Sequence, residues 1–178
     1  MTGLLKDSHE RLRTTMADLK RVYRNTRATD SRPEKIDLRN QIDGALMLMQ
    51  QRLASLDVIV DIHESAHDIM GRPAEIQHVI VNLIDNAAQA LGDSGRIRLK
   101  ARPEGQRVMF VVEDSGPGVP FDQRERIFEP FFTTREQGSG LGLSVVRRNV
   151  ENNKATIRVG QSELGGALFE IGFRMATQ

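Results

Sequence analysis

The sequence contains no cysteine and no tryptophan, and tyrosine occurs once. Without cysteine the chain cannot form a disulfide, and a thiol nucleophile, an iron–sulfur cluster and a cysteine-based zinc site are excluded. Neither sign of charge is in excess, because 25 Lys and Arg residues balance 24 Asp and Glu residues. This balance argues against a nucleic-acid-binding surface and against a polybasic patch that binds membranes.

Long apolar runs are also missing. No segment approaches the roughly 18 to 20 apolar residues of a membrane-spanning helix, and the polar residues 1–13 lack the apolar stretch of a signal peptide. We therefore expect a soluble chain that suits a reducing compartment and makes no direct membrane contact. The length of 178 residues suits one domain with a short appended element.

The N-terminal residues 4–27 have the pattern of one long, polar helix. Its narrow apolar seam repeats every seven residues at Leu5, Leu12 and Leu19. Because a lone helix this polar is marginal in water, we expect it to pack on a partner, such as a second copy of itself, or on the surface of its own domain. Residues 31–37 are predicted to be a linker, since Pro33 disfavours helix at the residue before it.

The remaining residues 38–178 are predicted to form one α+β domain. Apolar residues at helical spacing predict helices from Leu38 to Leu53, from Pro73 to Leu91 and from Leu141 to Asn152. Alternating apolar residues predict strands at 57–63, 96–101, 107–113, 155–160 and 167–174. This order of elements predicts a two-layer sandwich, in which about three helices cover one face of a mixed sheet.

Two asparagines of the predicted helix 73–91 are the first candidates for chemistry. Asn82 and Asn86 lie four residues apart, so both amides project from the edge of its apolar face. Neutral amide oxygens can ligate a hard cation such as Mg²⁺, and amide NH₂ groups can donate to phosphate. Taken alone, the pair also fits two solvated asparagines.

Three further segments follow between residues 114 and 143. Asp114-Ser-Gly-Pro-Gly-Val119 comes directly after a strand, where a carboxylate could accept from an exocyclic amine such as that of adenine. Residues 127–134 gather three phenylalanines beside Pro130, which fits either a movable lid or a core turn. The glycine-rich residues 138–143 open a helix, whose unpaired N–H groups and positive dipole end favour an anion. This last segment is neither a Walker P-loop nor a dinucleotide-binding fingerprint.

In this order, the four segments resemble those of the catalytic, ATP-binding domain of bacterial sensor histidine kinases. That domain shares a superfamily with gyrase-type ATPases, a heat-shock chaperone and mismatch-repair ATPases. The resemblance covers roughly residues 36–174. The four segments are similar to the N box (82–90), the G1 box (114–119), the F box (128–134) and the G2 box (138–143) of the family. The F box, Phe-Glu-Pro-Phe-Phe-Thr-Thr, points to histidine kinases over the other members.

The resemblance implies a role for each matching residue. Asn86 would ligate Mg²⁺ and Asn82 would assist at the phosphates of ATP, which makes both catalytic. Asp114 would bind the adenine amine, and residues 120–138 would be the lid over the nucleotide. The other nucleotide-binding residues that the resemblance implies are Gly116, Gly118, Val119, Thr134, Arg135, Gly138, Gly140, Leu141 and Gly142.

The resemblance also implies a cytoplasmic histidine kinase that phosphorylates a histidine on a helical hairpin and serves a response regulator receiver domain. A homodimer is expected in the full-length protein, and a membrane anchor there is left open. Hydrolysing relatives carry a glutamate base where this chain has Asn82, and an amide is not a general base. This favours phosphoryl transfer over a gyrase-type ATPase. The alternative is a non-catalytic module of the same fold that binds nucleotides or another protein.

The chain departs from the family pattern at several positions. Gln89 and Arg135 stand where lysine is frequent, and Arg135 could supply the positive charge that Gln89 lacks. Asn152-Asn-Lys154 replaces a frequent His-Gly-Gly, which should matter little to the nucleotide.

The family's phosphoacceptor motif is incomplete in this chain. His9-Glu10 is not followed by the proline of that motif, so we expect His9 to be a surface residue. Residues 1–30 are then expected to be the second helix of a dimerisation hairpin whose first helix is absent, and the chain a fragment or one half of a two-part system.

Overall fold

A computed structural model describes residues 32–135 and 138–176 of the protein. The helix predicted over residues 4–27, with His9, therefore lies outside the described residues. In chain order the elements are β1 (Glu34–Asp37), α2 (Leu38–Leu48), α3 (Gln50–Leu53), β2 (Asp57–Ile62), β3 (Asp68–Gly71), α4 (Pro73–Leu91), β4 (Arg96–Glu104), β5 (Arg107–Asp114), the 3₁₀ helices η2 (Phe121–Gln123) and η3 (Arg126–Phe128), α5 (Gly142–Asn152), β6 (Thr156–Gln161) and β7 (Ala167–Arg174).

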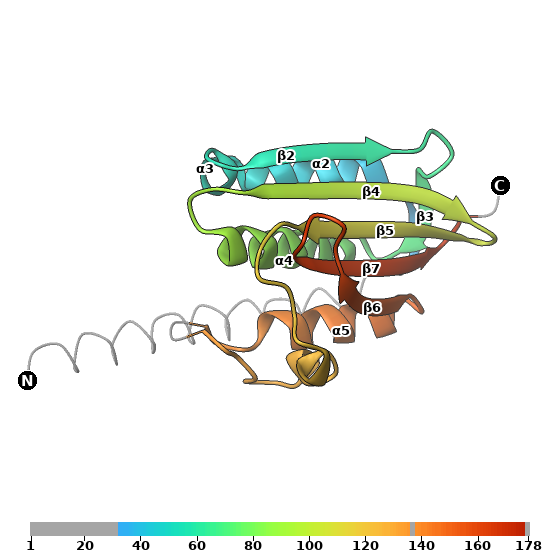
Figure 1. Ribbon diagram of the computed structural model, residues 1–178. Coiled ribbons are helices and arrows are strands. Elements are labelled where there is room, and N and C mark those ends of the chain that lie inside the picture. Colours follow the sequence, from blue (N-terminus) through green and yellow to red (C-terminus); the bar gives the residue numbers. More distant parts are fainter. Residues whose placement is uncertain (1–31, 136–137, 177–178) are drawn as a thin grey trace, which may run out of the picture.

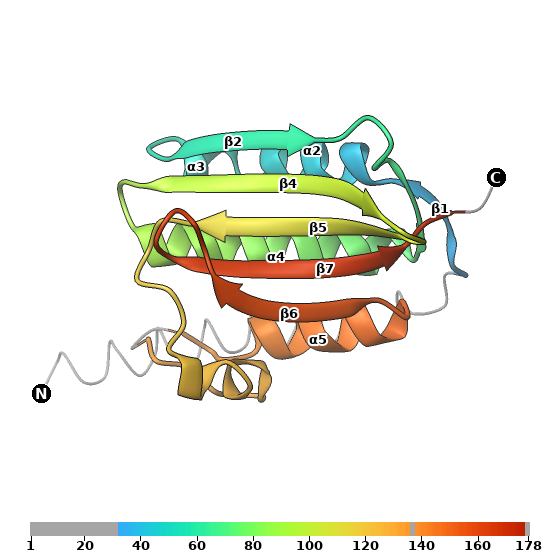
Figure 2. The same cartoon turned by 45° about the vertical axis from the view of Figure 1, so that its right-hand side comes forward.

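A five-stranded mixed sheet in the order β2-β4-β5-β7-β6 forms one layer of the domain. β2 runs parallel to β4, and the other neighbours are antiparallel. The helices α2, α4 and α5 form the second layer on one face of this sheet (Figures 1 and 2). The predicted two-layer α+β sandwich is therefore confirmed.

The central helix α4 follows from its sequence. Pro73 occupies the first turn, where its missing N–H is no loss, and Gly92 ends the helix with a φ of 66°. An apolar stripe on α4, which includes Ile76, Ile80 and Leu83, is fully buried against the sheet and the flanking helices. Because this stripe faces the core, the amides of Asn82 and Asn86 have to project at its edge.

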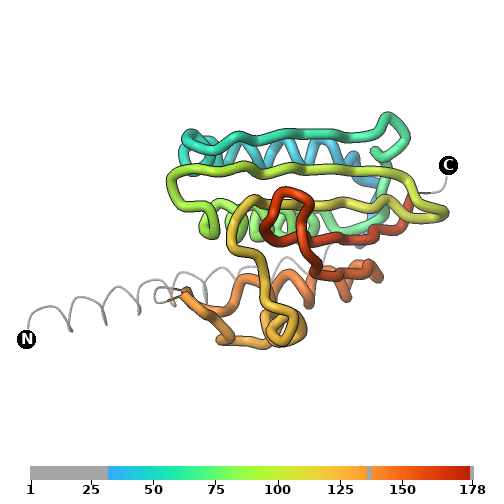
Figure 3. The backbone as a smooth tube through the Cα atoms, viewed as in Figure 1, coloured from blue at the N-terminus to red at the C-terminus, as the bar shows by residue number. Residues whose placement is uncertain are grey.

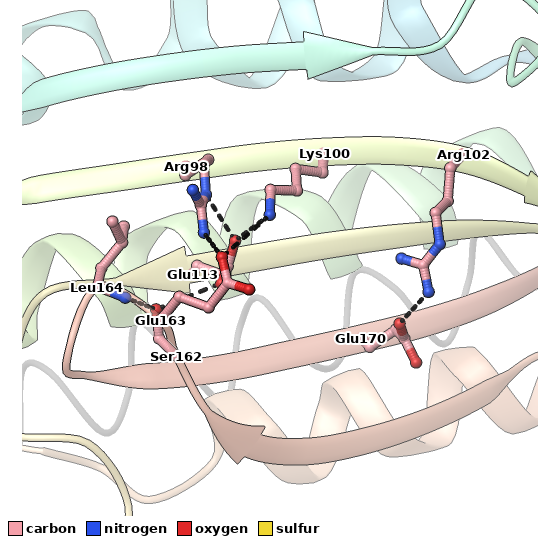
Figure 4. A network of polar contacts seen from close by, with 8 residues as sticks. All are labelled: Arg98, Lys100, Arg102, Glu113, Ser162, Glu163, Leu164 and Glu170. Carbon is pink, nitrogen blue, oxygen red and sulfur yellow. Dashed lines mark hydrogen bonds and ion pairs between the residues drawn. The ribbon is translucent and has the colours of Figure 1, made fainter.

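The outer face of the sheet is charged but well paired (Figure 4). The side chain of Glu113 on β5 is only 1% exposed, and its Oε2 lies 2.7 Å from Arg98 Nε and 3.1 Å from Lys100 Nζ. Burial acts to raise the pKa of Glu113, but the hydrogen bonds from Arg98 and Lys100 outweigh it and hold that pKa below its ordinary value. On β7, Glu170 is paired with Arg102 and Arg158 in the same way. The pairing fixes β5 against β4, so that the next residue, Asp114, points to the helix side.

The N-terminal part of the domain differs from the prediction in two places. Residues 34–37, predicted as part of a linker, are the strand β1, which pairs antiparallel with the unpredicted strand β3. The predicted helix 38–53 is divided into α2 and α3 at Met49, whose φ of −105° and ψ of 7° are not helical. Asp37 caps the N-terminus of α2, since its Oδ1 accepts from the backbone N–H of Arg39 at 2.8 Å.

The segment between β5 and α5 leaves the sheet and passes beside α5 (Figure 3). Its described residues contain the two short 3₁₀ helices η2 and η3. The segment includes residues 120–138, which were predicted to be the lid and are called the lid below; residues 136 and 137 lie outside the described residues. In the described part of the chain, no helix has the length and apolarity needed to cross a membrane.

Candidate nucleotide-binding site

A cavity of about 340 Å³ opens between α4, the end of β5, the lid and the start of α5. All but two of the predicted site residues line it, although they come from four separate segments of the chain. The lining residues that had been predicted are Asn82, Asn86, Asp114, Gly118, Val119, Thr134, Arg135, Gly138, Gly140 and Gly142. Gly116 and Leu141 do not line the cavity.

The carboxylate of Asp114 sits in a tight backbone cradle at the end of β5. The residue is 3% exposed, and its Oδ1 accepts from the backbone N–H of Gly116 at 2.8 Å and of Ala167 at 3.2 Å. Within the described part of the chain, no hydrogen bond ends on Oδ2. Burial raises the pKa of Asp114, while the two N–H donors and the charge of Arg135 act against the rise. One carboxylate oxygen is thus fixed and the other can accept from a ligand.

Gly166, in the turn before β7, makes this cradle possible. Its N–H donates to the backbone oxygen of Asp114 at 3.1 Å, and a Cβ at this position would collide with Oδ1 of Asp114. Gly116 contributes differently from the prediction, because it holds Asp114 through its N–H and does not face the cavity. The sequence signal for Gly166 was the Gly165-Gly166 pair, but its contact with Asp114 is not local in the chain.

The two α4 amides are held in different ways. Nδ2 of Asn82 donates to the backbone oxygen of His78 at 2.7 Å, one turn earlier in the helix. Nδ2 of Asn86 is buried and has no hydrogen-bond partner within the described residues. A buried amide without a partner destabilises a fold by about 1 to 3 kcal/mol. Asn86 is therefore the side chain in this cavity that most needs a ligand.

The glycine-rich turn closes the cavity at the N-terminus of α5. Gly140 has a φ of 67°, and a Cβ there would collide with the backbone of Phe131. The N–H of Phe131 donates to the oxygen of Gly140 at 3.0 Å, which ties the lid to the turn. α5 begins after Leu141 without a side-chain cap, so its first N–H groups and dipole favour an anion. The N–H of Leu141 itself contacts Ser139 Oγ at 3.4 Å.

Arg135 reaches from the lid to α4. Its Nη1 donates to Gln89 Oε1 at 2.6 Å, and its Nη2 donates to the backbone oxygen of Asn86 at 3.3 Å. Partial desolvation lowers the pKa of Arg135, and the charges of Asp85 and Asp114 oppose this, so the guanidinium stays positive at physiological pH. Asp85 and Gln89 also line the cavity. Neither was predicted to be a site residue. The sequence signals that could have indicated them are the charge of Asp85 and the replacement of a frequent lysine by Gln89.

Comparison with known proteins identifies the family and the fold of this chain. Residues 71–177 match the family described as histidine kinase-, DNA gyrase B-, and HSP90-like ATPase. Sensor histidine kinase ZraS of Escherichia coli (strain K12) is 36% identical over 140 residues, which cover 78% of this chain and 30% of ZraS. The chain spans about a third or less of the length of the first curated relatives that it matches.

Solved structures agree with this assignment. The nucleotide-free catalytic domain of the histidine kinase ThkA is 28% identical and superposes with a TM-score of 0.75, covering 82% of this chain and 97% of that one. Full-length ShkA in complex with AMPPNP is also 28% identical, with a TM-score of 0.70, and the match covers 82% of this chain and 32% of ShkA. The chain therefore belongs to the histidine kinase-, DNA gyrase B- and HSP90-like ATPase family, and it carries an ATP-binding catalytic domain of the sensor histidine kinase type.

Proposed function

We propose that this domain binds ATP together with Mg²⁺ and transfers the γ-phosphoryl group to a histidine on a helical hairpin. The observation that carries the proposal is the convergence of four chain segments, with complementary chemistry, on one cavity. The carboxylate of Asp114 lies at the end of β5, the amides of Asn82 and Asn86 lie on α4, and a glycine-rich turn leads into the uncapped N-terminus of α5.

Asp114 is the proposed adenine-binding residue. A carboxylate accepts hydrogen bonds and cannot donate them, so it favours the exocyclic amine of adenine over the carbonyl of guanine. The backbone cradle on Oδ1 supports this role, because it orients Oδ2 before any ligand arrives. Pre-orientation removes the entropy loss that a mobile carboxylate would suffer on binding.

Asn86 is the proposed metal-binding residue, with Asn82 beside it. No group of three or more acidic or histidine side chains that could hold a metal occurs within the described residues. A metal would therefore be shared between the phosphates of the nucleotide and a neutral amide oxygen, a ligand type that suits Mg²⁺. The buried Nδ2 of Asn86 fits the same role, since it would gain an acceptor on a phosphate or on a water. Bound Mg²⁺ would neutralise charge on the transferring group.

Transfer to histidine, and not to water, is proposed because the cavity offers no poised general base. Its carboxylates within the described residues are Asp85 and Asp114. Asp85 accepts from Arg52 and Gln89, and Asp114 is held by backbone N–H groups at the proposed adenine end. In the proposed transfer, the unprotonated nitrogen of a neutral imidazole forms the bond to the γ-phosphorus while the bridging P–O bond breaks to release ADP, and the proton on the other ring nitrogen passes to solvent.

The proposed partners follow from the relationship to sensor histidine kinases. The first is a dimerisation hairpin that carries the acceptor histidine, and we propose that residues 1–30 form one helix of such a hairpin. The second is a response regulator receiver domain, which accepts the phosphoryl group from that histidine. We further propose that the full-length protein is a homodimer whose catalytic domain works in the cytoplasm.

The direct test is incubation of the chain with ATP labelled in the γ-phosphate, Mg²⁺ and an intact dimerisation hairpin supplied separately. We expect labelled hairpin, acid-labile as a phosphohistidine is, and little release of free phosphate. The same reaction with Asn86→Ala should lose the label, while His9→Ala should keep it. Tight ATP binding without transfer to any histidine would instead favour a nucleotide-binding module, and rapid phosphate release would favour an ATPase.

A further inference from the structure

The positive charge of the cavity has a single source within the described residues. Arg135 is the only Lys, Arg or His side chain that lines it, whereas two carboxylates, Asp85 and Asp114, do so. A triphosphate is strongly anionic, and it binds well only where cations or N–H dipoles compensate its charge. The residues that place Arg135 therefore control how strongly the cavity attracts phosphate.

Arg135 stands on the lid, but its guanidinium is held by the opposite wall. The 2.6 Å bond from Nη1 to Gln89 and the 3.3 Å bond from Nη2 to the backbone of Asn86 both end on α4. The second contact brings the charge beside the residue that is proposed to share a metal with the phosphates. The same contact therefore joins the lid to α4 and places the positive charge beside Asn86.

Gln89 is in turn held by a chain of side chains that ends outside the cavity. Its Nε2 donates to Asp85 Oδ2 at 2.7 Å, and Asp85 Oδ1 lies 2.8 Å from Arg52 Nε on α3. Because the NH₂ group of Gln89 is bound to Asp85, its oxygen is turned toward Arg135. Arg52 itself does not line the cavity.

The neutrality of Gln89 matters for this arrangement. An amide oxygen orients a guanidinium without cancelling its charge, whereas a carboxylate at the same place would form an ion pair and compete with phosphate. Asp85 is a carboxylate close enough to compete in this way, but its two oxygens are already bonded to Arg52 and Gln89. In order, the four linked side chains are the cation Arg52, the anion Asp85, the neutral amide Gln89 and the cation Arg135.

We propose that Gln89, oriented by Asp85 and Arg52, is a positioning residue that holds the Arg135 guanidinium toward the phosphates of the bound nucleotide. This inference rests on the proposed function, since it needs a nucleotide in the cavity. It predicts that changes along the chain from Arg52 to Gln89 alter the preference for ATP over adenosine, and leave recognition of adenine unaffected.

The first test is Gln89→Glu, which keeps the shape of the side chain and pairs Arg135 with a carboxylate. We expect ATP affinity to fall about tenfold, ADP affinity to fall less and adenosine affinity to stay within twofold, measured by displacement of a fluorescent ATP analogue. Gln123→Glu is the matched control, because Gln123 lines the same cavity without a bond to Arg135. It reports the long-range repulsion that any new carboxylate would cause, and the effect of Gln89→Glu has to exceed it.

The second test is a double-mutant cycle between Arg52 and Arg135. Arg52→Ala should weaken ATP binding about threefold, because Asp85 is then free to draw Arg135 away from the phosphates. In an Arg135→Gln background the same change should have no further effect. Additive effects of the two substitutions would mean that Arg52 acts only through general stability, and would overturn the inference.

The outcomes separate this inference from the function on which it rests. If the unaltered chain fails to bind ATP, or if Asp114→Asn leaves binding unchanged, the proposed function itself is wrong. If those controls behave as expected but Gln89→Glu weakens ATP and adenosine equally, or no more than Gln123→Glu does, only the positioning role of Gln89 is wrong. A gain in ATP affinity with Gln89→Glu would equally contradict it.

Discussion

The two walls of the cavity are built in opposite ways. The wall made by α4 and the end of β5 is part of the core, and its functional side chains Asn82 and Asp114 are 9% and 3% exposed. The lid wall contains the two 3₁₀ helices; Phe128 on η3 is buried, but Phe121 on η2 is 85% exposed and Phe131, beyond η3, is 66% exposed. Selectivity for a base needs fixed groups, whereas entry of a nucleotide needs a wall that can move.

Contacts of the lid with the rest of the cavity show where the lid is held. The backbone bond from Phe131 to Gly140 joins it to the glycine-rich turn before α5, and the side chain of Arg135 joins it to α4. Phe131 has a φ of 66°, a conformation that is unfavourable for a bulky side chain. Few contacts and local strain are features of segments that open at low free energy. We therefore expect substitutions in the fixed wall to reduce stability and ATP affinity strongly, and substitutions on the surface of the lid to change them little.

Gly166→Ala is expected to have the largest effect, because it breaks the fixed wall. The added Cβ collides with Oδ1 of Asp114 and with the backbone of the cradle. We expect a loss of about 3 kcal/mol in the free energy of unfolding and no measurable ATP binding, tested by urea denaturation and calorimetry. Gly160→Ala is the matched control, since its Cβ would meet only Leu168 at 3.8 Å. Equal stability of the two variants would show that the cradle is not rigid.

Asp114→Asn should come next, with the fold intact. An asparagine amide can rotate to bind either base, so ATP affinity should fall by ten- to a hundredfold and preference over GTP should disappear. Calorimetry with ATP and GTP measures both. Retained preference for ATP would place the adenine elsewhere in the cavity. Because burial raises the pKa of Asp114, ATP affinity of the unaltered chain should also fall on acidification sooner than an ordinary carboxylate would predict.

Asn86→Ala should reduce ATP affinity about tenfold in the presence of Mg²⁺, which is the loss of one ligand or charge-assisted contact. In excess chelator the difference in ATP affinity between the variant and the unaltered chain should be smaller, because the contact through the metal is then absent from both. Loss of the buried unpaired amide should also leave the protein at least as stable as before. An equal loss of affinity with and without Mg²⁺ would contradict the assignment of Asn86 to the metal.

Glu113→Gln should affect stability and leave the nucleotide site alone, since Glu113 lies beside Asp114 in sequence but on the opposite face of the sheet. We expect a loss of about 1 kcal/mol at pH 7 with unchanged ATP affinity. The pKa of Glu113 is lowered, so its ionised form stabilises the unaltered chain above the unfolded-state pKa of about 4.3. That contribution is lost as pH falls through the folded-state pKa, and urea titrations from pH 7 to 3 should show the two chains converging.

Phe121→Ser should have the smallest effect. Phe121 is exposed on the lid and does not line the cavity. We expect the free energy of unfolding to change by less than about 0.5 kcal/mol and ATP affinity to stay within twofold. A large change in either, measured by urea denaturation and calorimetry, would show that the lid surface is part of the folded core and that the two walls do not differ as described.

Sequence patterns predicted the elements that have a long apolar period. The stripe of α4 and the alternation in β4, β5 and β7 are strong local signals, and they set the sandwich. β1 and β3 have four residues each and exist because they pair with each other across about thirty residues of chain, so neither has a recognisable period of its own.

The site shows the same division. The residue types in the four segments were sufficient to predict which side chains meet, because they recur together in a known family. The supports of those side chains were not predictable, since they join distant positions: Ala167 and Gly166 hold Asp114, and Arg52 holds Asp85. Local sequence patterns show which residue types are present, but contacts between distant positions form only when the sheet and helices are assembled.

A crystal structure of the chain with Mg²⁺ and a non-hydrolysable ATP analogue is the strictest test of the proposed nucleotide site. We expect the adenine amine within hydrogen-bond distance of Asp114 Oδ2, the metal on the side-chain oxygen of Asn86, and Arg135 facing the phosphates while still bonded to Gln89. An analogue bound with its base away from Asp114, or bound outside this cavity, would show that the proposed site is wrong.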